Sequence, residues 1–86
     1  MRKVEFDLDA FEQLSEWAST NKKVHSRICR IIVETARNPF EGIGKTEPLK
    51  GNFAGCWSRR ITDEHRMVYK VYDNSVRILA LEGHYE

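Results

Sequence analysis

The stretch from residue 24 to residue 35 carries the pattern that most restricts how this chain can fold. Its apolar and small residues recur at the spacing of a single helical face: Val24, Ile28, Ile31, Ile32 and Thr35. Charged residues fill the other faces: Lys23, Arg27, Arg30, Glu34 and Arg37. Asn38-Pro39 should end the helix, because Asn tolerates a left-handed C-cap and proline cannot continue a helix. The pattern predicts an amphipathic helix that needs an apolar surface to pack on.

A first helix is expected shortly before it. Asp9 can cap the helix start, and Glu12, three residues on, would complete a capping box. Ser19-Thr20-Asn21 interrupts the helical pattern, and Asn21 can cap the following helix. So short a connection predicts a helical hairpin. Lys3–Phe6, ahead of both helices, has the character of a short strand.

The remainder of the chain changes to strand signals. A stretch from Gly42 to Gly55 is punctuated by glycines and Pro48, and three strands are expected after it, over 57–61, 66–72 and 76–81. The middle strand alternates apolar and polar residues, whereas the last is apolar on both faces and should be central.

These elements predict an α+β fold in a single domain, residues 1–86. An N-terminal strand and a two-helix hairpin would pack on one face of a mainly antiparallel sheet. The chain has 86 residues, and a domain of this size buries only about 60% of the surface that its unfolded chain exposes. The second face of the sheet is left available for function.

Charge and composition exclude several classes of protein. The net charge is +1, yet residues 21–60 carry nine Lys and Arg against three acids, which suits an RNA or phosphate partner. No apolar run is long enough to cross a bilayer. Met1-Arg2-Lys3 is not followed by the apolar stretch of a signal peptide, so we expect a soluble, cytoplasmic protein. Cys29 and Cys56 have no metal-ligand spacing, and no metal or cofactor is predicted.

Three side chains could together cleave a phosphodiester bond in RNA. Glu47, near Lys45, can accept a proton from the ribose 2′-OH; Arg66 can stabilise charge on the phosphate; His84 can protonate the departing 5′-oxygen. Each residue alone could equally be an ordinary surface charge, or a frayed end in the case of His84. Such general acid–base cleavage would be independent of metal.

Further candidates lie beside these three. Tyr85 offers a ring on which a base can stack. Arg59 and Arg60 lie on the strand next to Arg66, and only one of them can share its face, because adjacent strand residues point to opposite sides.

At this point the sequence resembles a known family, the YoeB-type toxins of the RelE/ParE superfamily. Three blocks carry the resemblance, cover more than half of the chain, and stand in the family's order: Asn38–Lys50 (NPFEGIGKTEPLK), Gly55–Tyr69 (GCWSRRITDEHRMVY) and the terminal His84-Tyr85. The resemblance implies a RelE-like fold and a type II toxin–antitoxin system whose toxin cleaves mRNA on the translating 70S ribosome. It also implies a cognate YefM-type antitoxin, contact with operator DNA only through the antitoxin complex, and is compatible with a homodimer.

The resemblance assigns roles to matching residues. Glu47 is implied to be the general base, Arg66 the transition-state stabiliser and His84 the general acid. Lys50 and Tyr85 would bind substrate, and Arg59 would be an RNA contact.

Some residues depart from the family pattern, and two other functions stay open. Cys56 replaces a common aromatic residue, Ile43 interrupts a glycine-rich run, and Glu86 follows the terminal His-Tyr pair. A ParE-like gyrase poison would not need the three catalytic residues together. A non-catalytic RNA- or ribosome-binding module would use only the basic middle of the chain.

Overall fold

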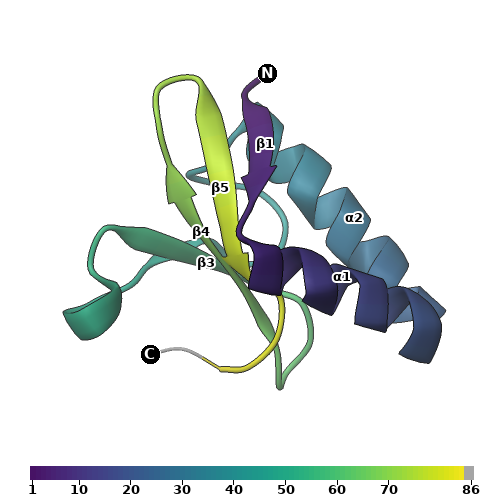
Figure 1. Cartoon of the computed structure of the whole chain (residues 1–86). Coiled ribbons are helices and arrows are strands. Elements are labelled where there is room, and N and C mark those ends of the chain that lie inside the picture. Colours follow the sequence, from purple (N-terminus) through teal and green to yellow (C-terminus); the bar gives the residue numbers. More distant parts are fainter. Residues whose placement is uncertain (85–86) are drawn as a thin grey trace.

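Two helices lie against one face of a five-stranded sheet in the computed structural model, which describes residues 1–84 (Figure 1). The elements, in chain order, are β1 (Lys3–Phe6), α1 (Leu8–Thr20), α2 (Lys22–Arg37), β2 (Glu47–Pro48), the 3₁₀ helix η1 (Gly51–Phe53), β3 (Cys56–Arg60), β4 (Arg66–Val71) and β5 (Ser75–Ala80). The predicted α+β class, with a helical hairpin on one face of the sheet, is confirmed.

The sheet is mainly antiparallel, as expected. Its strand order is β1-β5-β4-β3-β2, and only the β1–β5 pairing is parallel among the described strands. β5 therefore lies inside the sheet, as its largely apolar sequence predicted. The β1–β5 ladder extends one residue past β1, since the Asp7 backbone N–H donates to the Ile78 carbonyl at 3.0 Å.

The main core lies between the helices and the sheet. Ile28 and Ile31 of α2 are fully buried against Met67 and Tyr69 of β4 and Ile78 of β5. Burying each such side chain contributes roughly 1.5–3 kcal/mol relative to leaving it in water. The alternation in β4 was predicted correctly, because Met67 and Tyr69 face the helices while Val68 belongs to a separate apolar cluster.

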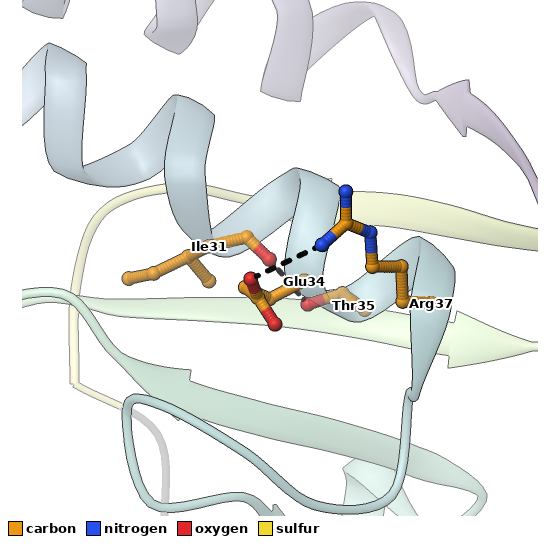
Figure 2. A network of polar contacts seen from close by, with 4 residues as sticks. All are labelled: Ile31, Glu34, Thr35 and Arg37. Atoms are coloured by element: carbon orange, nitrogen blue, oxygen red, sulfur yellow. Dashed lines mark hydrogen bonds and ion pairs between the residues drawn. The ribbon is translucent and has the colours of Figure 1, made fainter. Parts of the chain in front are cut away.

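Thr35 is the polar member of the buried face of α2, and its hydroxyl is satisfied locally. It donates to the Ile31 carbonyl one turn earlier, at 2.7 Å (Figure 2). Nearby on the helix, Arg37 and Glu34 form an ion pair with 3.9 Å between Nη1 and Oε1 (Figure 2). The hydroxyl can thus be buried without leaving an unpaired donor.

The helix termini differ in part from expectation. Asn21 caps α2 as predicted, its side chain accepting from the Val24 N–H at 3.2 Å. The prediction that Asp9 opens α1 was wrong: the helix begins at Leu8 with Asp7 as N-cap, and no side-chain cap bond forms. The chain enters α1 directly from the β1–β5 ladder, and Asp9 instead lies in the first turn, where a negative charge is favourable.

The end of α2 also has a different cause. Asn38 is extended, with φ of −145°, and not left-handed. The steric effect of Pro39 explains this, because a residue that precedes proline is pushed out of the helical region.

The glycine-punctuated segment contains structure that was not expected. Glu47–Pro48 forms β2, an edge strand that pairs with Ser58 and Trp57 of β3, and η1 follows. A two-residue strand containing proline has no alternation pattern of its own. It exists because β3 offers a partner.

On the sheet face away from the helices a smaller apolar cluster forms. Leu49, which follows β2, packs with Val68 and Ala80, and with the partly buried Cys56 and Leu79. Both cysteines are free thiols, Cys29 exposed and Cys56 half-buried. No helix in residues 1–84 is long and apolar enough to cross a membrane.

Tyr69 generates a prediction on alkaline stability. Its buried hydroxyl donates to the Pro39 carbonyl at 2.6 Å and accepts from Arg59 Nε at 3.3 Å. Burial raises the pKa of Tyr69 above its ordinary value of 10.0, although the hydrogen bond and charge of Arg59 act the other way. The folded state therefore favours the protonated phenol, and this stabilisation is complete below pH 10.0 and lost as pH rises through the folded-state pKa.

We expect the free energy of unfolding, measured by urea denaturation from pH 7 to 11, to fall more steeply above pH 10.0 in the wild type than in Tyr69→Phe. At pH 7 the variant should be less stable by about 1–3 kcal/mol, because the Pro39 carbonyl loses its donor. Parallel pH profiles for the two proteins would contradict this account.

Candidate active site

Strand alternation in β3 sends two adjacent arginines to opposite faces of the sheet. Arg59 points toward the helices and is fully buried. Arg60 is exposed on the other face and lies directly opposite Arg66 of β4 in the antiparallel register. The face on which arginines gather is therefore the face without helices.

A cleft of about 400 Å³ opens on this face. The C-terminal segment curves back below the sheet after β5 (Figure 1), and His84 lines the cleft. Its walls are formed by Lys45, Glu47, Pro48, Leu49, Lys50, Ser58, Arg60, Arg66 and His84. Four of the residues singled out from sequence, Glu47, Lys50, Arg66 and His84, thus line one cleft.

Backbone carbonyls of the turn before β4 hold the Arg66 guanidinium. Its Nη1 donates to the carbonyls of Thr62 at 2.6 Å and His65 at 3.1 Å, with a longer contact to Asp63 at 3.3 Å. Its Nη2 lies 3.1 Å from His84 Nε2. One edge of the guanidinium is therefore fixed by the turn, and the other faces the cleft beside the histidine.

The hydrogen bond between Arg66 and His84 has a defined direction. A guanidinium has only donors, so Nε2 of His84 must be the acceptor in this hydrogen bond. Nε2 is thus engaged by Arg66, and it becomes available to another group only once this contact opens.

Glu47 enters the cleft from the edge strand β2, where it pairs with Ser58. Its side chain is 55% exposed and lies 3.6 Å from Lys45 Nζ. An exposed ion pair of this kind contributes at most about 1 kcal/mol to stability, so Lys45 holds the carboxylate only weakly. The carboxylate remains accessible to a group bound in the cleft.

Positive charge exceeds negative charge in the cleft. Arg60 and Arg66 are cross-strand neighbours, and like charges placed directly opposite each other are destabilising. Lys45 and Lys50 add to them, and within residues 1–84 Glu47 is the single acid that lines the cleft. A bound phosphate would offset this repulsion, because charge-assisted bonds from guanidinium groups are strong and directional.

Arg60 is the arginine of the cleft to which sequence reasoning assigned no role. Alternation showed that only one of Arg59 and Arg60 could share the face of Arg66, but not which one. The apolar neighbours could have decided it, since Trp57 shares the face of Arg59 and packs on the main core.

Arg59 is not brought to the cleft. Its guanidinium donates to the carbonyls of Ile43 at 3.3 Å and Glu41 at 3.1 Å and also to that of Asn38, while Nε contacts the Tyr69 hydroxyl. These bonds fasten the segment that leads from α2 to β2. In this position Arg59 supports the fold and is closed off from a ligand in the cleft.

Glycine is needed at Gly44, where this segment passes over β3. Gly44 has φ of +85°, and a Cβ there would lie 3.0 Å from the Arg60 carbonyl oxygen. The next residue, Lys45, also has positive φ, at 51°. The backbone so placed carries Glu47 to the cleft.

Tyr85, expected to bind substrate, and Glu86 lie outside the described residues. In the described part of the chain no group of three or more His, Cys, Asp or Glu side chains is arranged to hold a metal ion.

Known proteins share this architecture. A YoeB dimer from Staphylococcus aureus is 40% identical, with 98% of each chain covered and a TM-score of 0.89. A heterotetrameric YoeB–YefM toxin–antitoxin complex from the same species is 40% identical, with 99% of each chain covered and a TM-score of 0.87. The chain thus has the RelE-like α+β architecture of these small toxins.

Sequence comparison specifies the family within this class. Residues 6–85 match the profile described as the YoeB-like toxin of bacterial type II toxin–antitoxin systems. Toxin YoeB of Mycobacterium bovis is 51% identical over 85 residues, covering 99% of this chain and all of its relative. The chain therefore belongs to the YoeB-like toxin family of type II toxin–antitoxin systems, as the three sequence blocks implied.

The two adjacent arginines provide a matched pair for a stability test. Arg59→Met should lower the free energy of unfolding by about 2–4 kcal/mol, because buried carbonyls and the Tyr69 hydroxyl lose their donor. Arg60→Met, on the same strand, should change it by no more than about 0.5 kcal/mol, because its side chain is exposed. Urea denaturation followed by circular dichroism measures both; equal losses would show that the buried network is not the cause.

The excess positive charge generates a second prediction. Inorganic phosphate should bind the cleft and shift the NMR signals of the His84 ring. Arg60→Gln and Arg66→Gln should each weaken this binding roughly tenfold or more, since each removes a charge-assisted hydrogen bond. Arg37→Gln, an exposed arginine on α2, is the control and should bind as the wild type does; an equal effect from all three would point to net charge alone.

Proposed function

We propose that this toxin is a ribosome-dependent endoribonuclease that inhibits translation by cleaving mRNA. The observation that carries the proposal is the convergence of Glu47, Arg66 and His84 on one basic cleft. Family membership supports it. A proton acceptor, a phosphate-binding cation and a proton donor are the three groups that cleavage through the ribose 2′-OH requires.

Glu47 begins the reaction as general base. Its exposed carboxylate takes the proton of the ribose 2′-OH, and the resulting oxygen nucleophile attacks the adjacent phosphorus. A new bond forms between the 2′-oxygen and phosphorus, the bond to the 5′-oxygen breaks, and a 2′,3′-cyclic phosphate is left on one fragment.

The arginines stabilise the charge that develops on the phosphate oxygens. Arg66 is pre-positioned for this, because the carbonyls of Thr62 and His65 fix its Nη1. Arg60 and Lys50 supply further positive charge from the same cleft. Groups already oriented before the reaction need no reorganisation as charge builds, which is the source of their catalytic effect.

His84 completes the reaction as general acid. In the resting site its Nε2 accepts from Arg66, so the same nitrogen cannot donate a proton until that bond opens. A scissile phosphate that takes the place of His84 as the partner of Arg66 releases Nε2, which takes a proton from solvent and donates it to the departing 5′-oxygen. Binding of the substrate phosphate therefore also makes His84 Nε2 available to act as the acid. Tyr85 supports the bound base by stacking, as the family resemblance implies.

Partners follow from the family. A YoeB–YefM complex and a YoeB dimer are known from Staphylococcus aureus. By analogy this toxin binds a YefM-type antitoxin, contacts operator DNA only through that complex, and forms a homodimer. Its substrate assembly is the 70S ribosome with bound mRNA, in the cytoplasm.

A ribosome-programmed cleavage assay tests the proposal. Wild-type toxin should cut mRNA on 70S ribosomes, and Arg66→Ala and His84→Ala should each lower the single-turnover rate by about 10²–10³-fold. Arg37→Ala and His25→Ala, which change the same residue types outside the cleft, should leave the rate unchanged.

Three outcomes would contradict different parts of the proposal. Intact mRNA with wild-type toxin refutes the nuclease function and, if DNA supercoiling is inhibited instead, favours a gyrase poison. Ribosome binding without cleavage favours a non-catalytic module. Normal cleavage by both alanine variants refutes the assignment of Arg66 and His84.

A further inference from the structure

The segment that carries His84 is fixed to the rest of the protein through Leu81 and Gly83. The backbone N–H and carbonyl of both residues form hydrogen bonds. Helix α1 holds Leu81: the Gln13 side chain accepts from its N–H at 2.7 Å, and Trp17 Nε1 donates to its carbonyl at 2.9 Å. The start of β4 holds Gly83, whose carbonyl accepts from the Arg66 N–H at 2.8 Å. These contacts stop one residue before His84.

The fourth contact comes from a side chain with no role in the reaction. The Gly83 N–H donates to Nδ1 of His65 at 3.0 Å. For Nδ1 to accept, a neutral ring must carry its proton on Nε2. His65 does not line the cleft, and it is half-buried.

The His65 ring is itself fixed in place. It packs edge-on against Trp17, with 5.0 Å between the ring centroids and an interplanar angle of 77°. Its own backbone N–H donates to the Thr62 hydroxyl at 3.1 Å, and its carbonyl accepts from the Ile61 N–H at 3.0 Å. An acceptor held this rigidly can define the direction of the backbone that it binds.

Gly83 converts that contact into an orientation for His84. Its φ is +89°, a conformation that residues with a side chain rarely adopt, so the chain turns sharply at this point. The turn brings the His84 ring back to Arg66, the residue immediately after His65. Two consecutive residues thus hold the tail. His65 binds the backbone N–H of Gly83, and Arg66 contacts both the Gly83 carbonyl and the His84 ring.

We infer that His65 is a positioning residue for the catalytic tail: its Nδ1, supported by Trp17, holds Gly83 so that His84 meets Arg66 in the cleft. This inference rests on the proposed function for its kinetic consequence, but the hold itself is a property of the folded chain. Misplacement of a reacting group by about 1 Å can cost on the order of a hundredfold in rate. A group that touches no substrate can therefore govern the rate of cleavage.

Side chains that differ in one feature separate the acceptor from the packing. His65→Phe keeps a ring against Trp17 but removes the acceptor. His65→Asn places an amide oxygen where Nδ1 lies, and His65→Gln places its amide one bond further out. His25→Leu changes a histidine on α2 that does not contact the tail.

The first measurement is hydrogen exchange of the Gly83 amide by NMR, with urea denaturation of each variant for comparison. Gly83 should exchange faster in His65→Phe and His65→Gln than in the wild type, in excess of any change in global stability, whereas His65→Asn and His25→Leu should retain protection. If His65→Phe fails to fold, the Gln and Asn variants still make the comparison. Unchanged protection of Gly83 in His65→Phe and His65→Gln would overturn the inference.

The second measurement is the rate of mRNA cleavage on ribosomes. His65→Phe and His65→Gln should lower kcat by roughly 10- to 100-fold with little change in KM, and His65→Asn should restore most of the loss. Normal kcat in both His65→Phe and His65→Gln, despite a loosened Gly83, would overturn the positioning role. If wild-type toxin does not cleave mRNA, the proposed function fails, while the exchange data still decide whether His65 holds the tail.

Discussion

The antiparallel pairing of β3 with β4 is the constraint on which both the core and the cleft depend. Its register places Arg59 opposite Met67 on the face toward the helices, and Arg60 opposite Arg66 on the other. Arg59 thereby binds the segment between α2 and β2, and Arg60 is accessible to a ligand in the cleft. A slip of one residue would exchange these faces, burying Arg60 and expelling Arg59 from its carbonyl partners.

Much of the architecture could be predicted because periodic patterns are local. The stripe on α2, the alternation in β4 and the apolar β5 each follow from burial on one or two faces, and the structure bears them out. The start of α1 was misplaced because the ladder with β5 determines where the helix begins, and that ladder is a long-range contact. β2 was missed for the same reason, since it exists only through pairing with β3.

The candidate site was predictable in its residue types and less so in its geometry. Glu47, Arg66 and His84 were selected by chemistry and by resemblance to a family, and they line one cleft. Which of Arg59 and Arg60 faces the cleft could not be predicted without the register between β3 and β4. The hold of His65 on Gly83 needed more, because it joins a turn to the chain end across 18 positions of sequence.

The separation of the two sheet faces has a consequence for how such a toxin is lost. The core under the helices contributes most of the buried apolar surface, while the charged residues of the cleft are exposed or half-buried and add little to stability. On the proposed mechanism, a copy that loses His84 or Arg66 should therefore persist as a folded and inert protein. Escape from toxicity needs only single substitutions that are silent in folding, so disarmed copies would accumulate beside active ones and look intact by every measure except activity.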